Sequence, residues 1–163
     1  MAEKWTKRFI WAALIHGFIS VILTVLFVIP ALGLPAIMAV GFVSGPLSYK
    51  VGTWVFVGYV TYVLVGFVGL SAWAFLYSSS GEVNDWLSWA HLVLHNIGLI
   101  ASWLILAAGV IGGTAQLGGA LTVPEVHVNI AWVFIPTVVL MAVLMLGTLI
   151  GLVNLLIALL KER

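Results

Sequence analysis

Four histidines are the side chains of this sequence best suited to binding a metal, and each lies in or beside a long apolar stretch: His16, His91, His95 and His127. An imidazole inside a lipid bilayer finds no partner in the hydrocarbon, so its presence there indicates a functional site. His91 and His95 are four residues apart and therefore share one face of a helix. The chemistry that these residues suggest is metal ligation, haem ligation or proton transfer.

The charged residues are few and leave long apolar runs between them. Of the 163 residues, 64% are hydrophobic and 7% are charged, whereas a soluble domain carries about 25% charged residues. The charge-free runs are 9–49, 51–81, 86–124 and 126–160. Because a spanning helix needs about 20 apolar residues, each run holds at least one span. The sequence therefore predicts an all-α integral membrane protein, a four-helix bundle that forms a single transmembrane domain over 1–163.

The expected spans end at clusters of glycine, proline and serine. They cover residues 8–32, 51–77, 84–111 and 126–160, and Asn84 or Asp85 is the expected cap of the third span. The stretch 33–50 is apolar but rich in Gly and Pro, and we expect it to form an interfacial or re-entrant loop. Four spans place five of the six Lys and Arg residues on one side of the membrane. The charge distribution therefore predicts that both termini are cytoplasmic.

The composition excludes several classes of function. The chain has no cysteine, so it forms no disulfide, no thiolate metal site and no iron–sulfur cluster, and it attaches no haem through cysteine. The net charge is +1, and no basic run is long enough to indicate binding to nucleic acid. No stretch outside the expected spans is long enough for an aqueous domain, which leaves the bilayer and its surface as the place for any chemistry.

Small and polar residues follow helical seams in three of the spans. In the third span they recur at alternating spacings of three and four, the period of helices in a left-handed bundle; the residues are Ser88, His91, His95, Gly98, Ser102, Ile105, Gly109 and Gly112. The seam of the second span consists of Gly52, Val55, Tyr59, Tyr62, Gly66, Gly69 and Trp73. The fourth span carries a small close-packing patch at Gly147, Gly151 and Asn154. Plain helix packing explains the glycines.

Three of the histidines are expected at similar depths in the membrane. Counted from the nearest charged residue at 1.5 Å per residue, His16 lies roughly 12 Å deep, and His91 and His95 roughly 9 and 15 Å deep. A b-type haem needs two imidazoles from different helices in an apolar slot. We expect His16 and His95 to be the axial ligands of a haem b, with His91 as an alternative ligand or a neighbour. Gly98, one turn beyond His95, would leave room for the macrocycle.

Other interpretations of these residues stay open. Tyr59, Tyr62 and Trp73 are expected to line the haem pocket or an adjacent quinone slot. The three histidines could instead bind zinc, relay protons, or hydrogen-bond to backbone carbonyls within a packed core. His127 lies beside Glu125 at the outer end of the fourth span, where it could ligate a second haem or contact a quinone. One haem and two haems are both compatible with the sequence.

Short motifs resemble a known family. The segment Trp89-Ala-His91-Leu-Val-Leu-His95-Asn96-Ile-Gly98 resembles a late helix in the catalytic subunit of the heme-copper oxidase and nitric oxide reductase superfamily. The first span, from His16-Gly17 to Pro30-Ala-Leu-Gly33, is similar to the haem-ligating helices of that family, and Gly151-Leu-Val-Asn154 resembles the end of a subsequent helix. The resemblance implies haem binding with His16 at a matched ligand position, and a bacterial or archaeal plasma membrane.

The departures from the family restrict the function that it implies. The family's catalytic subunit is much larger, and its copper or non-haem iron site needs further histidines that include a His-x-His pair. This sequence has no His-x-His, so we expect no copper site and no reduction of oxygen at a binuclear centre. The resemblance implies a miniature haem-binding relative.

The expected function is that of a membrane b-type cytochrome that transfers single electrons, with quinol or a partner redox protein. Apart from lipid, the expected partners are a second copy of the chain in a homodimer or the other subunits of a respiratory complex. Two alternatives are an accessory, non-catalytic subunit of such a complex and a gas-reactive or sensing haem protein. Whether the chain catalyses a reaction is left open by its residues.

Overall fold

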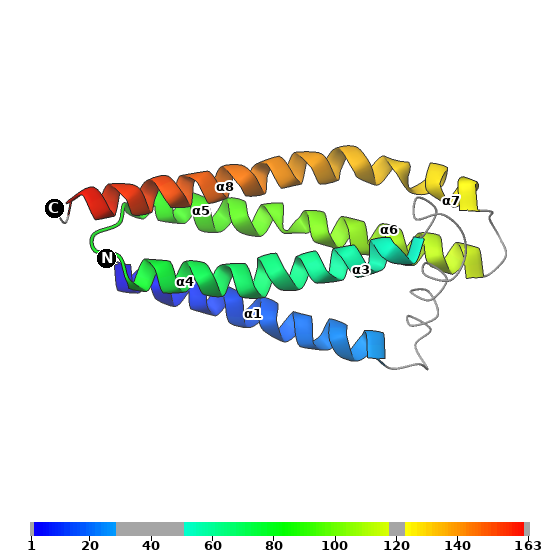
Figure 1. Ribbon diagram of the computed structural model, residues 1–163, viewed down its shortest axis with the longest axis horizontal. Coiled ribbons are helices and arrows are strands. Elements are labelled where there is room, and N and C mark those ends of the chain that lie inside the picture. Colours follow the sequence, from blue (N-terminus) through cyan, green and yellow to red (C-terminus); the bar gives the residue numbers. More distant parts are fainter. Residues whose placement is uncertain (1, 29–50, 118–122, 162–163) are drawn as a thin grey trace. The chain divides into compact units, whose positions relative to one another are not determined.

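Helices make up nearly all of the protein that the structure describes. In the computed structural model these described residues are 2–28, 51–117 and 123–161, and no strand occurs among them (Figure 1). The helices are α1 (Ala2–Val28), α3 (Val51–Tyr62), the π-helix η3 (Val63–Gly69), α4 (Leu70–Ser78), α5 (Asp85–Gly98), α6 (Ile100–Leu117), α7 (Val123–Ile130), the 3-10 helix η4 (Ala131–Val133) and α8 (Phe134–Lys161). The predicted all-α class is confirmed.

Four helical stretches are long and apolar enough to cross a membrane. They are Ala2–Leu26, Thr53–Ser78, Asp85–Ala115 and Val128–Lys161. The first begins six residues before the predicted start at residue 8, and the others agree with the predicted spans to within a few residues. The predicted loop at 33–50 lies outside the described residues. The prediction of four helices long and apolar enough to span a membrane is confirmed among the described residues, and these helices are typical of a membrane protein.

The third long helix begins at the predicted cap, with Asn84 as the cap residue and Asp85 as the first residue of α5. The Asn84 side chain accepts a hydrogen bond of 3.1 Å from the backbone N–H of Leu87, which satisfies one of the amide groups that a helix start leaves without a partner. Asp85 follows in the first turn, where its negative charge suits the helix dipole. Gly98 ends α5, and Leu99 separates it from α6.

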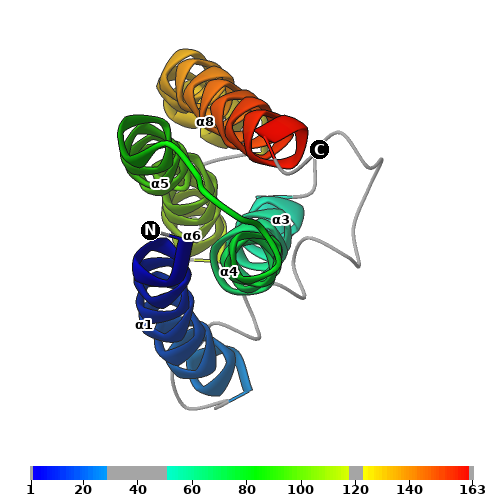
Figure 2. The ribbon, with the colours of Figure 1, turned by 90° about the vertical axis from the view of Figure 1, so that its left-hand side faces the viewer.

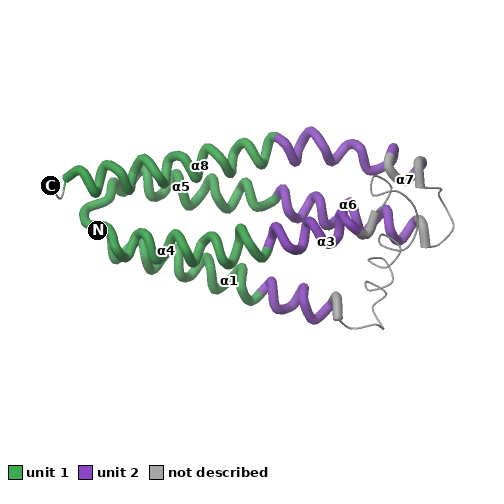
Figure 3. Tube along the Cα trace, in the orientation of Figure 1, with its two compact units in different colours: residues 1–18, 63–100, 139–163 green, residues 19–62, 101–138 purple. Residues whose placement is uncertain are grey.

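The chain divides into two compact units, and each of the four long helical stretches contributes to both (Figure 3). Unit 1 consists of residues 1–18, 63–100 and 139–163. Unit 2 consists of residues 19–62 and 101–138. In unit 2, Ala108, Ile130 and Val133 form a small buried cluster against Trp54 and Leu104.

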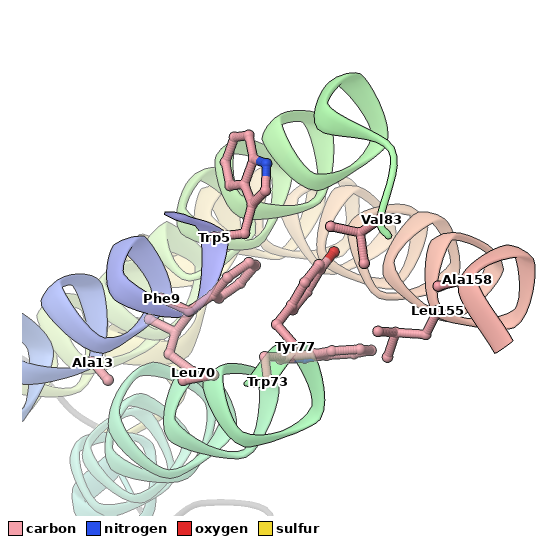
Figure 4. Packing of buried hydrophobic residues seen from close by; sticks show 10 residues of the cluster. Trp5, Phe9, Ala13, Leu70, Trp73, Tyr77, Val83, Leu155 and Ala158 are labelled. Atoms are coloured by element: carbon pink, nitrogen blue, oxygen red, sulfur yellow. The ribbon is translucent and has the colours of Figure 1, made fainter. Parts of the chain in front are cut away.

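Unit 1 has an aromatic core between α1, α4 and α8 (Figure 4). Its buried members are Trp5, Phe9, Ala13, Leu70, Trp73, Ala74, Tyr77, Val83, Leu155 and Ala158. The start of α1, the turn from α4 to α5 and the end of α8 lie at the same end of this unit (Figures 1 and 2). Lys4 pairs with Asp85 at 3.1 Å, and the Trp5 indole N–H donates to the same carboxylate, so α1 is tied to the start of α5.

Glycines set the contact between α5 and α8 in unit 1. A Cβ atom at Gly98 would lie 2.5 Å from Leu144 Cβ and 2.7 Å from its backbone nitrogen. A Cβ at Gly147 would lie 2.9 Å from Leu94 Cβ. Small residues at a helix interface let two backbones approach closely, which is how helices associate in a bilayer. The predicted close-packing patch on the fourth span is therefore an interface with α5.

The α5–α8 contact generates the first testable prediction. The Gly98→Ala change introduces a methyl group that must push the α8 backbone away, and overpacking of this kind costs about 1–3 kcal/mol. We expect a lower midpoint of thermal unfolding in detergent micelles. The control is Ala142→Val at an exposed position of α8, which adds apolar volume without a clash. Equal midpoints of thermal unfolding for Gly98→Ala, Ala142→Val and the wild type would contradict the close contact between α5 and α8.

Candidate functional site: a buried histidine cluster

His91 occupies an aromatic cage in the core of unit 1. The residue has 0% exposure. Its ring centroid lies 4.2 Å from that of Trp73, in an edge-on arrangement, and 5.0 Å from that of Phe9. On the α8 side, a Cβ atom at Gly151 would come within 2.5 Å of two atoms of the imidazole. The missing side chain of Gly151 therefore makes the room in which His91 lies, and any larger residue there would displace the ring.

A hydrogen-bonded chain connects His91 to the turn between α4 and α5. His91 Nδ1 lies 3.3 Å from the Tyr77 hydroxyl oxygen, and the Asn154 amide nitrogen lies 3.3 Å from the same oxygen. The Asn154 amide nitrogen also donates to the Ser88 hydroxyl at 2.8 Å. All four residues are buried. Polar groups in an apolar interior need such partners, because each one left unpaired costs about 1–3 kcal/mol.

The direction of the Asn154 hydrogen bonds follows from groups whose roles are certain. The backbone N–H of Asn84 can only donate, and it donates to Asn154 Oδ1 at 2.9 Å. The other end of the Asn154 amide is therefore the NH₂ group, which can only donate to Tyr77. Tyr77 therefore accepts from Asn154. If Tyr77 donates its own hydrogen to His91 Nδ1, the His91 proton is on Nε2; if His91 Nδ1–H donates to the Tyr77 oxygen, the proton is on Nδ1.

His95 is held by the backbone of the π-helix. It is 3% exposed, and its Nε2 lies 3.1 Å from the carbonyl oxygen of Val65 in η3. A carbonyl only accepts, so Nε2 carries the proton and Nδ1 holds a lone pair. A seven-residue π-helix is uncommon and is frequently found at functional sites. Here it presents the carbonyl that fixes the orientation of the imidazole.

One nitrogen of each buried imidazole has no hydrogen-bond partner among the residues that the structure describes: His91 Nε2 and His95 Nδ1. His95 Nδ1 holds a lone pair and is an acceptor, whereas His91 Nε2 is a donor in the tautomer that accepts from Tyr77. The ring centroids are 5.9 Å apart at an interplanar angle of 68°. In that tautomer the neighbouring rings offer complementary unpaired groups, an N–H on His91 and a lone pair on His95.

His16 lies against a different partner. The side chain is half-buried, and its Nε2 is 2.8 Å from Asn96 Oδ1. Asn96 donates through its amide nitrogen to the Leu92 carbonyl at 2.7 Å, so Oδ1 is the acceptor and His16 Nε2 carries the proton. Gly66 of η3 lies beside His16 and Leu99: a Cβ atom at Gly66 would lie 3.4 Å from His16 Cβ and 2.9 Å from Leu99 Cδ2.

The expected haem ligands, as they are packed, do not fit the group. His16 and His95 both direct Nε2, the nitrogen that would bind iron, at an oxygen of the protein 2.8 and 3.1 Å away. The space that Gly98 was expected to leave for the macrocycle is filled by Leu144. In the described ranges no group of three His, Cys, Asp or Glu residues is close enough to hold a metal ion. Haem or zinc binding stays a prediction.

The remaining predicted site residues lie elsewhere. Tyr59 and Tyr62 belong to unit 2, whereas His16, His91 and His95 belong to unit 1. The Tyr59 hydroxyl is 2.6 Å from the Thr24 hydroxyl, and the Tyr62 ring contacts Trp103 edge-on at 5.0 Å. His127 is part of α7, and its side chain lies outside the described atoms. Of the second-span seam, Trp73 contacts a histidine ring, that of His91.

Sequence reasoning missed Tyr77 as a member of the site and assigned Asn154 only a packing role. A signal for Tyr77 was present, because it lies four residues after Trp73 and continues the second-span seam by one helical turn. No comparable signal marks the Val65 carbonyl, since any residue supplies one.

Comparisons with known proteins find no match to this chain among protein-family models, curated proteins or solved structures. The resemblance to the heme-copper oxidase superfamily therefore stays a prediction, and the function has to be argued from the chain's own residues. The most distinctive feature of these residues is the pair of buried, neighbouring imidazoles of His91 and His95, each with one unpaired nitrogen.

The hydrogen bonds of Asn154 generate the second prediction. Asn154→Leu keeps the size of the side chain but leaves Tyr77, Ser88 and the Asn84 N–H without this partner. Since each buried polar group left unpaired costs about 1–3 kcal/mol, we expect a loss of at least about 2 kcal/mol in the free energy of unfolding, measured in mixed micelles. The matched control is Asn129→Leu, because Asn129 is exposed and bonds to the Glu125 carbonyl of its own helix. An equally small effect of both changes would contradict the role of Asn154.

Proposed function

We propose that this membrane protein takes up and releases protons through Tyr77, His91 and His95, which we call the proton relay. The observation that carries the proposal is the succession of these three side chains in the buried core, with one unpaired nitrogen on each imidazole. In the proposed relay Tyr77 donates to His91 Nδ1, so that His91 has an unpaired N–H at Nε2 and His95 has an unpaired lone pair at Nδ1. Imidazole is suited to such transfer because it accepts a proton at one nitrogen and releases one at the other.

Each transfer step balances. Tyr77 gives its hydroxyl proton to His91 Nδ1 as His91 releases its Nε2 proton. A water molecule that enters between the two rings carries this proton to His95 Nδ1. His95 then releases its own Nε2 proton to water at η3, because the Val65 carbonyl accepts a hydrogen bond but not a proton. The tyrosine oxygen is reprotonated from the α4–α5 end of unit 1. One passage leaves both imidazoles with the proton on Nδ1, and the same steps run backwards restore the proton to Nε2. A second proton in the same direction needs each ring to turn over.

We further propose that the α4–α5 end faces the cytoplasm of a bacterial or archaeal cell. Lys4, Lys7 and Arg8 begin the chain and Lys161 and Arg163 end it, and positively charged residues favour the cytoplasmic side. The start of α1 and the end of α8 lie at the α4–α5 end of unit 1 (Figure 2). In this orientation Tyr77 exchanges protons with the cytoplasm.

Hydrogen–deuterium exchange at the imidazoles tests the relay. The protein, labelled with ¹⁵N-histidine and reconstituted in lipid bilayers, is moved into D₂O, and the loss of the imidazole N–H signals is followed by NMR. We expect Tyr77→Phe to slow exchange at His91 and His95 by at least about tenfold, because exchange must then wait for local opening of the helices.

The matched control is Tyr59→Phe, which removes a tyrosine hydroxyl in unit 2 and leaves the relay intact. Equal exchange rates in the wild type and in Tyr77→Phe would refute the relay, provided that both unfold at the same temperature. A haem absorption band that co-purifies with the protein and is lost in both His16→Ala and His95→Ala would instead favour electron transfer by a b-type cytochrome.

A further inference from the structure

The start of α1 carries one more cation than its carboxylate neighbours pair with. Lys4 pairs with Asp85 at 3.1 Å, and Lys7 pairs with Glu3 at 2.7 Å. Arg8 forms no ion pair within the part of the chain that the structure describes. Its side chain is exposed, so its positive charge is available to an anion from outside the protein.

The ring of Trp5 holds the guanidinium of Arg8 in place. The guanidinium carbon lies 4.5 Å from the ring centroid, which is a cation–π contact. Trp5 is buried and its indole N–H donates to Asp85, so the ring has a fixed position. A guanidinium presents several N–H donors in one plane, which suits it to the oxygens of a phosphate group. Because Arg8 is already positioned, it loses little freedom when it binds such a group.

The register of α1 against α5 places Trp89 at the level of Arg8. Two hydrogen bonds between these helices join residues that are 80 apart in the sequence: Trp5 to Asp85 and His16 to Asn96. At this constant offset α1 and α5 run side by side in the same direction. Arg8 lies one turn after Lys4, and Trp89 lies one turn after Asp85, the partner of Lys4. Arg8 and Trp89 therefore follow each other along the same boundary between the two helices.

Exposed tryptophans mark this level of unit 1. Trp11, one turn after Arg8 on α1, and Trp86, at the start of α5, are each 67% exposed, and Trp89 is 46% exposed. The rings of Trp86 and Trp89 are stacked, with centroids 5.0 Å apart. Tryptophan concentrates where lipid head groups meet the hydrocarbon, because an indole combines an apolar ring with an N–H donor. These rings indicate that Arg8 lies at the level of the head groups.

An apolar stripe continues from Arg8 along the same side of α1. Trp11, Ile15 and Phe18 follow at spacings of three and four residues, which keep them on one helix face. All three side chains are exposed. From Arg8 to Phe18 the helix rises about 15 Å, which is half of a hydrocarbon core of about 30 Å. The stripe therefore matches the length of an acyl chain in one leaflet.

We propose that this surface of unit 1 binds an anionic phospholipid. A phosphate oxygen of the lipid accepts from Arg8, and an acyl chain lies along Trp11, Ile15 and Phe18. The unpaired cation at one end and the apolar stripe below it complement such a lipid in charge and in length. A zwitterionic lipid also offers a phosphate, but its own cation offsets the attraction to Arg8. The proposal does not depend on the proton relay.

Native mass spectrometry of the full-length protein released from detergent micelles tests the site, with phosphatidylglycerol as the probe. We expect the wild type to bind phosphatidylglycerol more tightly than phosphatidylcholine. Arg8→Gln should raise the dissociation constant for phosphatidylglycerol roughly tenfold, because a hydrogen bond between charged groups is lost. The matched control is Lys161→Gln, which removes the same charge from an exposed residue of α8; it should leave this constant unchanged.

Two further measurements make the outcome decisive. Phe18→Ala shortens the apolar stripe and keeps the cation, and it should weaken binding severalfold without lowering the temperature of unfolding, because Phe18 is exposed. Glycerol 3-phosphate, which has no acyl chain, should not displace the lipid; displacement would overturn the lipid in favour of a site for free phosphate. Equal affinity of the wild type for both lipids would overturn the site, as would equal losses in Arg8→Gln and Lys161→Gln or full binding by Phe18→Ala.

Discussion

The close contact of α5 with α8 is the constraint on which the histidine site depends. Three glycines make it possible, Gly98 on α5 and Gly147 and Gly151 on α8. Only at this separation does Asn154 of α8 reach both the Ser88 hydroxyl and the Tyr77 hydroxyl. Gly151 also makes room for the His91 ring. Helix packing and the chemistry of the site therefore have the same origin: residues without side chains let polar side chains meet in an apolar interior.

An apolar interior also restricts the hydrogen bonds of the site, because water is not there to replace a missing partner. Backbone groups with a single role orient two of the side chains: the Asn84 N–H orients Asn154, and the Val65 carbonyl orients His95. The groups that remain unpaired are then informative. Among the described residues of unit 1 they are one nitrogen on each of two neighbouring imidazoles. This is where we expect a proton to move.

The sequence predicted which face of a helix is buried better than it predicted which residues of other helices lie against that face. The apolar runs predicted four long helices, and the seam of the third span predicted that Ser88, His91 and His95 are buried. A seam shows which side of a helix faces inward, but not which residue of another helix lies across from it. For that reason the sequence assigned Gly98 to a macrocycle, whereas Leu144 fills that space. No sequence signal marks the Val65 carbonyl as the partner of His95, because every residue has a backbone carbonyl.

The most direct test of this account is the position of the proton on each buried imidazole. Solid-state ¹⁵N NMR of histidine-labelled protein in lipid bilayers distinguishes Nδ1–H from Nε2–H, and His91→Gln and His95→Gln assign the signals. The account predicts that His91 and His95 are both neutral, with the proton on Nε2. A bare Nε2 on either ring, or signals shifted and broadened by bound iron, would contradict it and would point to His91 or His95 as a haem ligand.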